Sequence, residues 1–411
     1  MPASSPDVVV IGAGAAGLMA AISAAERGKS VVLLEKNRKP GVKILMSGGT
    51  RCNITHACDN RGIVEAFGPN GRFLHAPLAK FSVADAIAFF EDLGVATKVE
   101  DTGKIFPVSD RALDVLDALL RRMHASGAAL VREEPVTDLK RTEGGFEITT
   151  AKQRLSVPRV ILTTGGQSYP GCGTRGDGYE FTRRFGHTIV TPRPALVPIR
   201  VEAPWVAELR GVTLDDVGMK VIERPDRVLT ARRGGFLFAH FGLTGPAPLD
   251  VSKAITKHPI PRSLELEIDF LPGMSETDFD EFLRTETLAS GKKQLAGVLA
   301  QKVPRRLADA LLALLGQAAD RKAAGLSRPD RIALAAAVKR QRLAVGGALG
   351  FEKAEVTTGG VSLDEVDSKT MQSKLVPGLY LAGEILDLDG PIGGYNFQAA
   401  WSTGWLAGAS V

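Results

Sequence analysis

The stretch "VVVIGAGAAGLMAA", Val8 to Ala21, decides the fold of this 411-residue chain. An apolar strand leads into Gly12, Gly14 and Gly17, and an alanine-rich helix follows them. In G-x-G-x-x-G the first glycine permits a tight turn, the second lets a pyrophosphate approach, and the third lets helix and strand pack closely. Glu35 ends the next strand, "SVVLLE", where it can accept hydrogen bonds from ribose hydroxyls. We therefore predict a doubly wound α/β domain that binds a dinucleotide.

A second glycine turn lies near the other end of the chain, in "AGEILDLDGPIGGYNFQAAW", Ala382 to Trp401. A ligand that needs both turns must extend across the domain, and FAD is such a ligand. Gly383 and Glu384 would lie near its ribityl and phosphate groups. Gly393 and Gly394 would begin a helix whose positive end faces the flavin pyrimidine edge, or would form an ordinary helix-entry turn.

A third cluster, "MSGGTRCNITH", runs from Met46 to His56. Gly48 and Gly49 allow close backbone approach, Arg51 supplies a fixed charge, and Asn53 offers both donors and acceptors.

Two residues are candidate proton donors. Cys52 is either an acid for a substrate or a small buried filler. His240, in "FAHFGLTGP", is either catalytic or a structural residue of a glycine-flanked turn.

The middle of the chain interrupts the α/β pattern. Three prolines in "TPRPALVPIR", Thr191 to Arg200, indicate a linker. Short β-rich pieces follow, and then helical stretches that Ser275 and Asp278 open as a capping box. We expect an insert of roughly Ala195 to Ala344.

The composition, with 44% hydrophobic and 24% charged residues, is that of a soluble globular protein. Cys52, Cys58 and Cys172 have no C-x-x-C spacing, so we expect no disulfide framework and no metal site, and a cytoplasmic location. Val8 to Ala25 is uncharged, but its glycines and the absence of a preceding positive charge favour a buried strand, turn and helix. We expect no membrane segment.

Positive charge is concentrated in one segment. Between Gly291 and Arg342 there are 12 Lys and Arg residues against Asp309, Asp320 and Asp330. The segment has no Phe, Tyr or Trp, so it could grip phosphates without stacking bases. The alternative is a set of solvated helix faces, and charge reversal at Lys292, Lys293, Arg305 and Arg306 would separate the two.

Together these segments resemble the BaiN/YhiN family of bacterial flavoproteins, labelled NAD(P)/FAD-dependent oxidoreductases. The resemblance also includes "GKIFPVSDRA", "TTGGQSYPGCGTRGDGY", "VTTGGV" and "TMQSK", so that it covers nearly the whole chain. Thr50 stands where the family usually has glycine, and Ala399 where it usually has tryptophan.

The resemblance implies a Rossmann-like FAD-binding domain (1–194 and 345–411) interrupted by an inserted β-barrel domain (195–274 with 327–344) and a small helical domain (275–326). The cofactor-binding residues that it implies, with those named above, are Gly12, Gly14, Ala15, Ala16, Gly17, Glu35, Lys36, Lys43, Gly48, Gly49, Arg51, Cys52, Asn53, Val136, Thr164, Gly165, Gly166, Gly383, Glu384, Gly393, Gly394, Tyr395, Asn396 and Phe397.

The resemblance implies the cofactor more firmly than the substrate. Family members have been linked to C=C reduction in bile-acid intermediates, to aminoacetone oxidation and to reduction of uridine to dihydrouridine in large-subunit ribosomal RNA. No second apolar strand leads directly into a G-x-G-x-x-G, so NAD(P)H would visit the flavin transiently as electron donor.

The leading prediction is an FAD-dependent reductase that uses NAD(P)H and acts on a uridine of ribosomal RNA, which the 291–342 segment would hold. The alternatives are a small-molecule reductase, an oxidase of a small amine, and an FAD-containing RNA-binding factor without catalysis. A dithiol reductase is disfavoured because five residues separate Cys52 from Cys58. The oligomeric state stays open.

Overall fold

The structure is a computed structural model that describes residues 5–289, 291–318 and 320–411. The chain divides into two compact units, one of residues 1–193 with 356–411 and one of residues 194–355. Residues 1–4 of the predicted FAD domain, and 290 and 319 of the predicted helical domain, lie outside the described residues. The first unit is therefore built from both ends of the chain.

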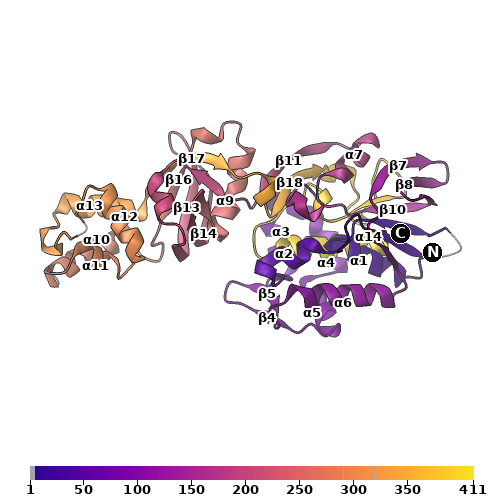
Figure 1. Ribbon diagram of the computed structural model, residues 1–411, viewed down its shortest axis with the longest axis horizontal. Coiled ribbons are helices and arrows are strands. Elements are labelled where there is room, and N and C mark those ends of the chain that lie inside the picture. The colour runs from indigo at the N-terminus through magenta and orange to yellow at the C-terminus, as the bar shows by residue number, and fades with distance from the viewer. Residues whose placement is uncertain (1–4, 290, 319) are drawn as a thin grey trace. The chain divides into compact units, whose positions relative to one another are not determined.

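A five-stranded parallel sheet forms the centre of the first unit (Figure 1). Its order is β19 (Leu379–Leu381), β10 (Arg159–Leu162), β1 (Val8–Ile11), β2 (Val31–Leu34) and β6 (Ala129–Val131). Every residue of β1 and β2 is buried, which explains their continuous apolar sequences. The last strand of the chain thus lies in the same sheet as the first.

Helix α1 (Ala15–Ala25) is apolar on almost every side because it packs against both the sheet and α14 (Tyr395–Ala409). A Cβ added at Gly404 would lie 2.3 Å from the Ala16 carbonyl oxygen, and one at Gly408 would lie 2.2 Å from that of Ala20. The two helices therefore approach backbone to backbone, and the first and last helices of the chain form one layer.

The remaining elements of the first unit surround this core. Two antiparallel sheets have the orders β7 (Val136–Thr142), β8 (Gly145–Thr150), β9 (Arg154–Val157) and β3 (Thr55–His56), β5 (Lys104–Pro107), β4 (Thr97–Val99). The helices are α2 (Val42–Thr50), α3 (Asn60–Ala66), α4 (His75–Lys80), α5 (Val83–Asp92), α6 (Ala112–Ala125) and α7 (Asp177–Arg184).

The second unit contains a closed barrel in the order β12 (Ile199–Val201), β15 (Gly242–Thr244), β14 (Arg227–Ala239), β13 (Thr213–Glu223), β16 (Leu264–Asp269) and β17 (Gln341–Ala348). Strand β17 pairs with both β16 and β12 and closes it. Two helices, α8 (Pro204–Glu208) and α9 (Pro246–Lys257), pack against the barrel.

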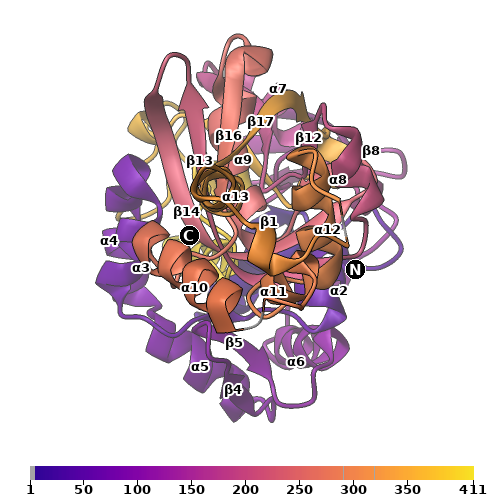
Figure 2. The same cartoon turned by 90° about the vertical axis from the view of Figure 1, so that its left-hand side faces the viewer.

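Four more helices complete this unit: α10 (Glu276–Ala289), α11 (Leu295–Leu299), α12 (Arg305–Leu314) and α13 (Arg328–Lys339), which Figure 2 shows nearest the viewer. Ser275 accepts from the Asp278 amide at 3.0 Å, as the capping box predicts. These helices share one apolar core with the barrel, which includes Phe238, Leu283 and Leu334. The predicted helical domain is therefore not a separate folding unit.

One boundary and one assignment predicted from the sequence are wrong. The second unit continues past Ala344 to Glu355, because β17, which contains Ala344, is a barrel strand. Residues 328–339, assigned to the β-rich part, form α13, which packs against α10.

The predicted linker, 191–200, contains the junction of the two units, between Arg193 and Pro194. It also has secondary structure, because it overlaps β11 (Ile189–Ala195), paired with β18 (Val356–Val361), and the start of β12. Prolines are tolerated in β11 because it lies at a sheet edge.

Among the described residues no single helix has both the length and the apolar character needed to cross a membrane. One bent pair, Gly68–Lys80 with Val83–Asp92, meets those criteria only as two segments joined at 44°.

Candidate cofactor site

The first glycine turn lies between β1 and α1, at the carboxyl edge of the sheet. A Cβ at Gly12, where φ is +104°, would lie 2.6 Å from the Thr163 carbonyl oxygen, and one at Gly17 would lie 1.8 Å from that of Gly12. A Cβ at Gly14 would meet no atom within 4 Å. Two of the glycines therefore close the turn, and the third leaves open space at the start of α1.

The helix start beside Gly14 carries unused donors. The first intrahelical bond joins the Leu18 amide to the Gly14 carbonyl, so the amides of Ala15 and Ala16 precede the helical ladder. Gly14 provides no side-chain cap. Open space in front of free amides at the positive end of a helix is suited to a pyrophosphate.

Glu35 follows β2 and is held in place by the backbone on both sides. Its two carboxylate oxygens accept from the amides of Ala13 and Asn37, each at 2.8 Å, and the residue is 7% exposed. A carboxylate has about four acceptor positions, so capacity for ribose hydroxyls remains. Glu35 therefore both braces the turn and presents an anchored acceptor.

Other predicted residues lie around this turn. Thr163 donates to the Gly12 carbonyl at 2.8 Å, which places the following Thr164, Gly165 and Gly166 beside the turn. The backbone of Glu134 donates to that of Glu35 at 3.0 Å, which brings Val136 to the same edge. Lys36 instead forms an ion pair with Asp177.

A polar network links β19 to α2. Glu384 accepts from Lys43 at 2.5 Å, from the Ser168 hydroxyl at 2.7 Å and from the Thr357 amide at 2.8 Å. Lys43 also donates to Ser168 at 2.7 Å. Gly383 precedes this carboxylate, and a Cβ there would lie 2.8 Å from that of Ala16. The "AGE" segment is thus held directly against α1.

The second glycine turn contacts the third cluster. With its amide oriented to satisfy its neighbours, Asn53 accepts from the Gly394 amide at 2.9 Å and donates to the carbonyls of Thr55 and Ile105. A Cβ at Gly394, where φ is +95°, would lie 2.4 Å from the Thr55 carbonyl. Asn53 therefore clamps the start of α14, and this turn is filled by protein.

The side chains that follow this turn also have protein partners. Asn396 accepts from the Gly390 amide at 2.8 Å and closes the loop before the helix. The rings of Tyr395 and Phe397 stack on those of His56 and Trp401, with centroids 4.5 and 5.3 Å apart. Their role in cofactor binding stays a prediction.

Arg51 lies over the Phe106 ring, 3.9 Å from its centroid, and pairs with Glu100 at 2.6 Å and with Asp110. The Glu100 hydrogen bond raises the pKa of Arg51, while a hydrogen bond from Lys98 lowers the pKa of Asp110. Gly48, Gly49 and Thr50 just before it are all left-handed, with φ of 56°, 67° and 71°. The chain reverses direction here in a tight turn, next to the ion pairs of Arg51.

The two candidate proton donors have different surroundings. Cys52 is fully buried, and burial raises its thiol pKa to about 12, so the thiol holds its proton and reaches no open surface. This burial argues for a filler rather than an acid. His240 is exposed in the turn between β14 and β15, in the second unit, with Phe241 edge-on at 4.9 Å. Its role as donor stays a prediction.

Three buried hydroxyls within the described chain have no hydrogen-bond partner: those of Thr164, Tyr179 and Thr358. Burial, with the nearby carboxylates of Glu384 and Asp387, raises the pKa of Tyr179. Such unpaired groups beside the Glu384 network, together with the open face of Gly14, fit a site completed by a polar ligand such as FAD.

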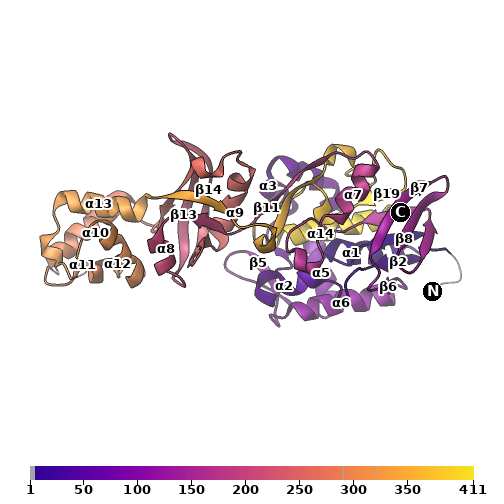
Figure 3. The same ribbon diagram turned by 45° about the horizontal axis from the view of Figure 1, so that its top comes forward.

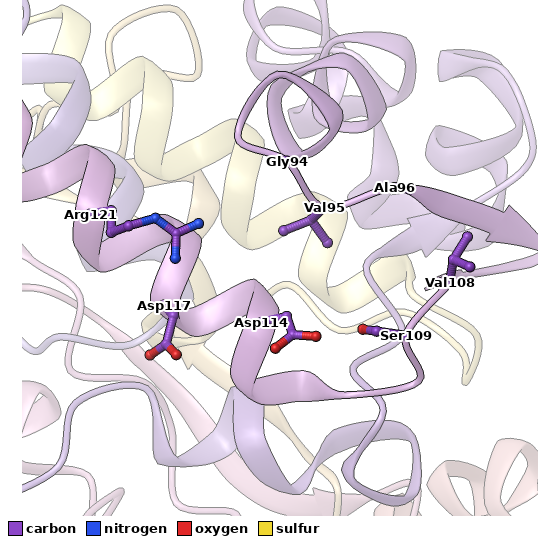
Figure 4. A pocket seen from close by; sticks show the side chains of 8 residues that line it. All are labelled: Gly94, Val95, Ala96, Val108, Ser109, Asp114, Asp117 and Arg121. Carbon is purple, nitrogen blue, oxygen red and sulfur yellow. The ribbon is translucent and has the colours of Figure 1, made fainter.

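A surface pocket of about 430 Å³ lies elsewhere in the first unit, beside α6 (Figure 4). It is lined by Gly94, Val95, Ala96, Val108, Ser109, Asp114, Asp117 and Arg121. None of the predicted cofactor residues lines it, and we do not assign the site there.

The sequence reasoning missed several residues that hold the site. Ser168, Thr357 and Gln398 lie far from their partners in the sequence, so no spacing signals them. Gly404 and Gly408 were detectable, because glycines four residues apart on a helix share one face.

Comparisons with known proteins agree with this geometry. Residues 6–410 match the model of the family described as HI0933-like protein Rossmann domain. The chain is 33% identical over 404 residues to the ribosomal RNA dihydrouridine synthase of Escherichia coli, covering 97% of this chain and 96% of the relative. It is also 33% identical over 409 residues to the 3-dehydro-bile acid delta(4,6)-reductase of Clostridium scindens, covering 98% of each.

Among solved structures, 3-ketosteroid-delta4-(5alpha)-dehydrogenase from Rhodococcus jostii shares the fold, with a TM-score of 0.53 at 15% identity over 98% of this chain and 96% of that one. Full-length matches of this kind extend over both units and both glycine turns. The chain therefore belongs to the HI0933-like Rossmann-domain family, a family of FAD-dependent oxidoreductases.

Proposed function

We propose that this protein is an NAD(P)H-dependent, FAD-containing reductase that converts a uridine of large-subunit ribosomal RNA to dihydrouridine in the cytoplasm. The observation that carries the flavin part is the turn in which Gly12 and Gly17 are closed by backbone while Gly14 faces open space beside Glu35. The relatives named ribosomal RNA dihydrouridine synthases, at 33% and 31% identity over nearly the full chain, support the substrate.

The chain's own residues supply binding and orientation. The amides at the start of α1 hold the pyrophosphate, and Glu35 accepts from the ribose. Lys43 and Glu384 set the charge and hydrogen bonding along the ribityl chain, and Asn53 fixes the start of α14. FAD, when bound, supplies the hydride that reduces the C5=C6 bond. A protein acid must then deliver a proton to C5, for which Cys52 and His240 stay the predicted donors.

The test has two parts. The purified protein should be yellow, release FAD rather than FMN on denaturation, and bleach on anaerobic addition of NADPH. Dihydrouridine in large-subunit rRNA, measured by mass spectrometry of nucleosides, should disappear in a deletion strain and return with the wild-type gene. Unchanged dihydrouridine in the deletion strain would contradict the RNA substrate and leave the flavin assignment standing.

A small-molecule C=C reductase is the second candidate. The relative named a bile acid reductase has the same identity as the E. coli synthase. In addition, six of the 12 cations in the basic segment are already paired with carboxylates. NADPH-driven reduction of a conjugated steroid ketone without any effect of RNA would favour this candidate.

A further inference from the structure

The 12 cations of the basic segment differ in the partners that they have in the structure. Six have carboxylate partners at nitrogen–oxygen distances between 2.7 and 3.3 Å: Arg305 with Asp309, Arg321 with Asp330, Arg331 with Asp280, Lys339 with Asp269, Arg340 with Glu276, and Arg342 with Asp226, Glu265 and Glu267. Several of these carboxylates lie outside the segment, which is why its sequence overstates the free charge.

Two further cations have structural roles. Arg306 donates to the carbonyls of Glu208, the last residue of α8, and Arg210, which follows the helix. Lys302 lies 4.8 Å from the centre of the Phe282 ring. Arg305 is already paired with Asp309, and Arg306 is bonded to backbone carbonyls. Reversing either charge would alter contacts within the protein, so half of the variant suggested by the sequence is unsuitable as a test of free charge.

Four cations remain: Lys292, Lys293, Lys322 and Arg328. Arg328 is the first residue of α13, and the three lysines are gathered in one place. Residues 291–294 run antiparallel to 321–324, with the Leu295 amide bonded to the Arg321 carbonyl at 2.8 Å and that of Ala323 to the Lys293 carbonyl at 2.9 Å. Gln294 and Lys322 are directly opposite each other. The two segments precede α11 and α13 in the chain, helices that Figure 3 labels. The short ladder between them brings Lys292, Lys293 and Lys322 together, and we call these three residues the lysine ladder.

The lysine ladder has no counter-charge. All three lysines are exposed, and none has a carboxylate partner within the described part of the chain. By strand alternation Lys292 and Lys322 share a face as diagonal neighbours, about 7–8 Å apart. Like charges so placed repel, and this arrangement costs stability without serving the fold. Six of the other nine cations in this segment are paired with carboxylates, whereas these three lysines, like Arg328 at the start of α13, are exposed without one in the described part of the chain.

We propose that the lysine ladder is the site at which this protein holds the phosphate backbone of its RNA substrate, an inference that rests on the proposed function. Lysine ammonium groups are hydrated point charges that bind phosphates without reading bases. With no aromatic ring in the segment, the lysine ladder gives affinity and orientation, and the choice of uridine falls to the flavin site.

The experiment compares three full-length proteins of known FAD content. The test variant is Lys292→Gln/Lys293→Gln/Lys322→Gln. The matched control, Lys80→Gln/Lys353→Gln/Lys369→Gln, removes the same charge from exposed lysines elsewhere. The third, Lys292→Arg/Lys293→Arg/Lys322→Arg, keeps the charge. Thermal unfolding and NADPH-driven flavin bleaching should be unchanged in all three.

Binding is measured by anisotropy with unmodified, transcribed large-subunit rRNA fragments between 50 and 300 mM salt. The test variant should bind on the order of 100-fold more weakly at low salt, with the slope of log K against log salt smaller by about 2, while the control and the arginine variant stay near wild type. Cellular dihydrouridine should fall with the test variant alone.

Equal salt slopes for the test and control variants would overturn the assignment. If dihydrouridine in the rRNA is still lost on deletion of the gene, only the assignment of the lysine ladder is wrong. If deletion leaves dihydrouridine unchanged, the proposed function is wrong as well. Loss of binding to anionic lipid vesicles, with RNA binding intact, would assign the lysine ladder to a membrane surface and also overturn the inference.

Discussion

The two glycine turns of the first unit look alike in sequence and differ in what they do. At Gly14 an added Cβ would meet nothing within 4 Å, whereas at Gly394 it would lie 2.4 Å from the Thr55 carbonyl. The first turn leaves open space, in which we propose that the cofactor lies, and the second lets one protein segment approach another. A glycine motif therefore signals close approach, and only the structure shows whether the approaching group is a cofactor or the chain itself.

Gly14→Val should have the largest effect, and on the cofactor alone. Its side chain enters the space in front of the α1 amides, and losing two charge-assisted bonds of about 1.5–3 kcal/mol each corresponds to at least ~100-fold weaker FAD binding. The melting temperature of the apoprotein should match that of wild-type apoprotein, because the backbone at Gly14 is extended and unobstructed. Absorbance at 450 nm per mole of protein measures the loss, and full FAD retention would contradict the site.

Gly394→Ala should act on the fold instead. The left-handed backbone costs about 1–2 kcal/mol and the overlap with Thr55 about 1–3 kcal/mol. We expect a loss of about 3 kcal/mol, or roughly 6–12 °C in melting temperature for a unit of this size. The matched control is Gly14→Ala, at the open turn, and an equal shift in both would remove the distinction between the turns.

Asn53→Ala should weaken the second turn by about 1–3 kcal/mol, since the Gly394 amide and two carbonyls lose their partner. Asn53→Asp keeps the acceptor for the Gly394 amide but loses both donors. Its melting temperature should therefore lie between those of the wild-type protein and the alanine variant. A wild-type melting temperature for the alanine variant would show that Asn53 does not clamp α14.

Thr50→Gly should give the smallest effect, and it should stabilise. A β-branched residue at φ 71° destabilises the folded state by about 1–2 kcal/mol, and glycine removes this strain. Glycine also raises the entropy of the unfolded chain, which offsets about 0.5–1 kcal/mol of that gain. A net gain of about 0.5–1 kcal/mol should appear as a rise of a few degrees. Gly49→Ala, at φ 67° in open space, is the inverse control and should lower the melting temperature.

Much of the first unit was predictable because its signals are local. Gly12, Gly14, Gly17 and Glu35 lie within one strand–turn–helix–strand segment whose geometry follows from spacing. The joining of the two chain ends was also expected, from the strand and turn before α14.

The parts that were not predictable depend on partners far away in the sequence. Ser168 and Thr357 meet Glu384 only after the sheet has formed, and β17 completes a barrel whose other strands come much earlier. The free charge of the basic segment was overestimated for the same reason, because Asp269, Glu276 and Asp280 neutralise part of it from outside the segment.

The joining of both chain ends in one sheet has a consequence for synthesis on the ribosome. Strand β19 and helix α14 are translated after the whole of the second unit, yet β19 pairs with β10 and α14 packs on α1. The second unit is complete at Glu355 and can fold while the chain is still growing. The first unit cannot cover α1 until α14 has been made, so the growing chain needs protection of that apolar helix until then.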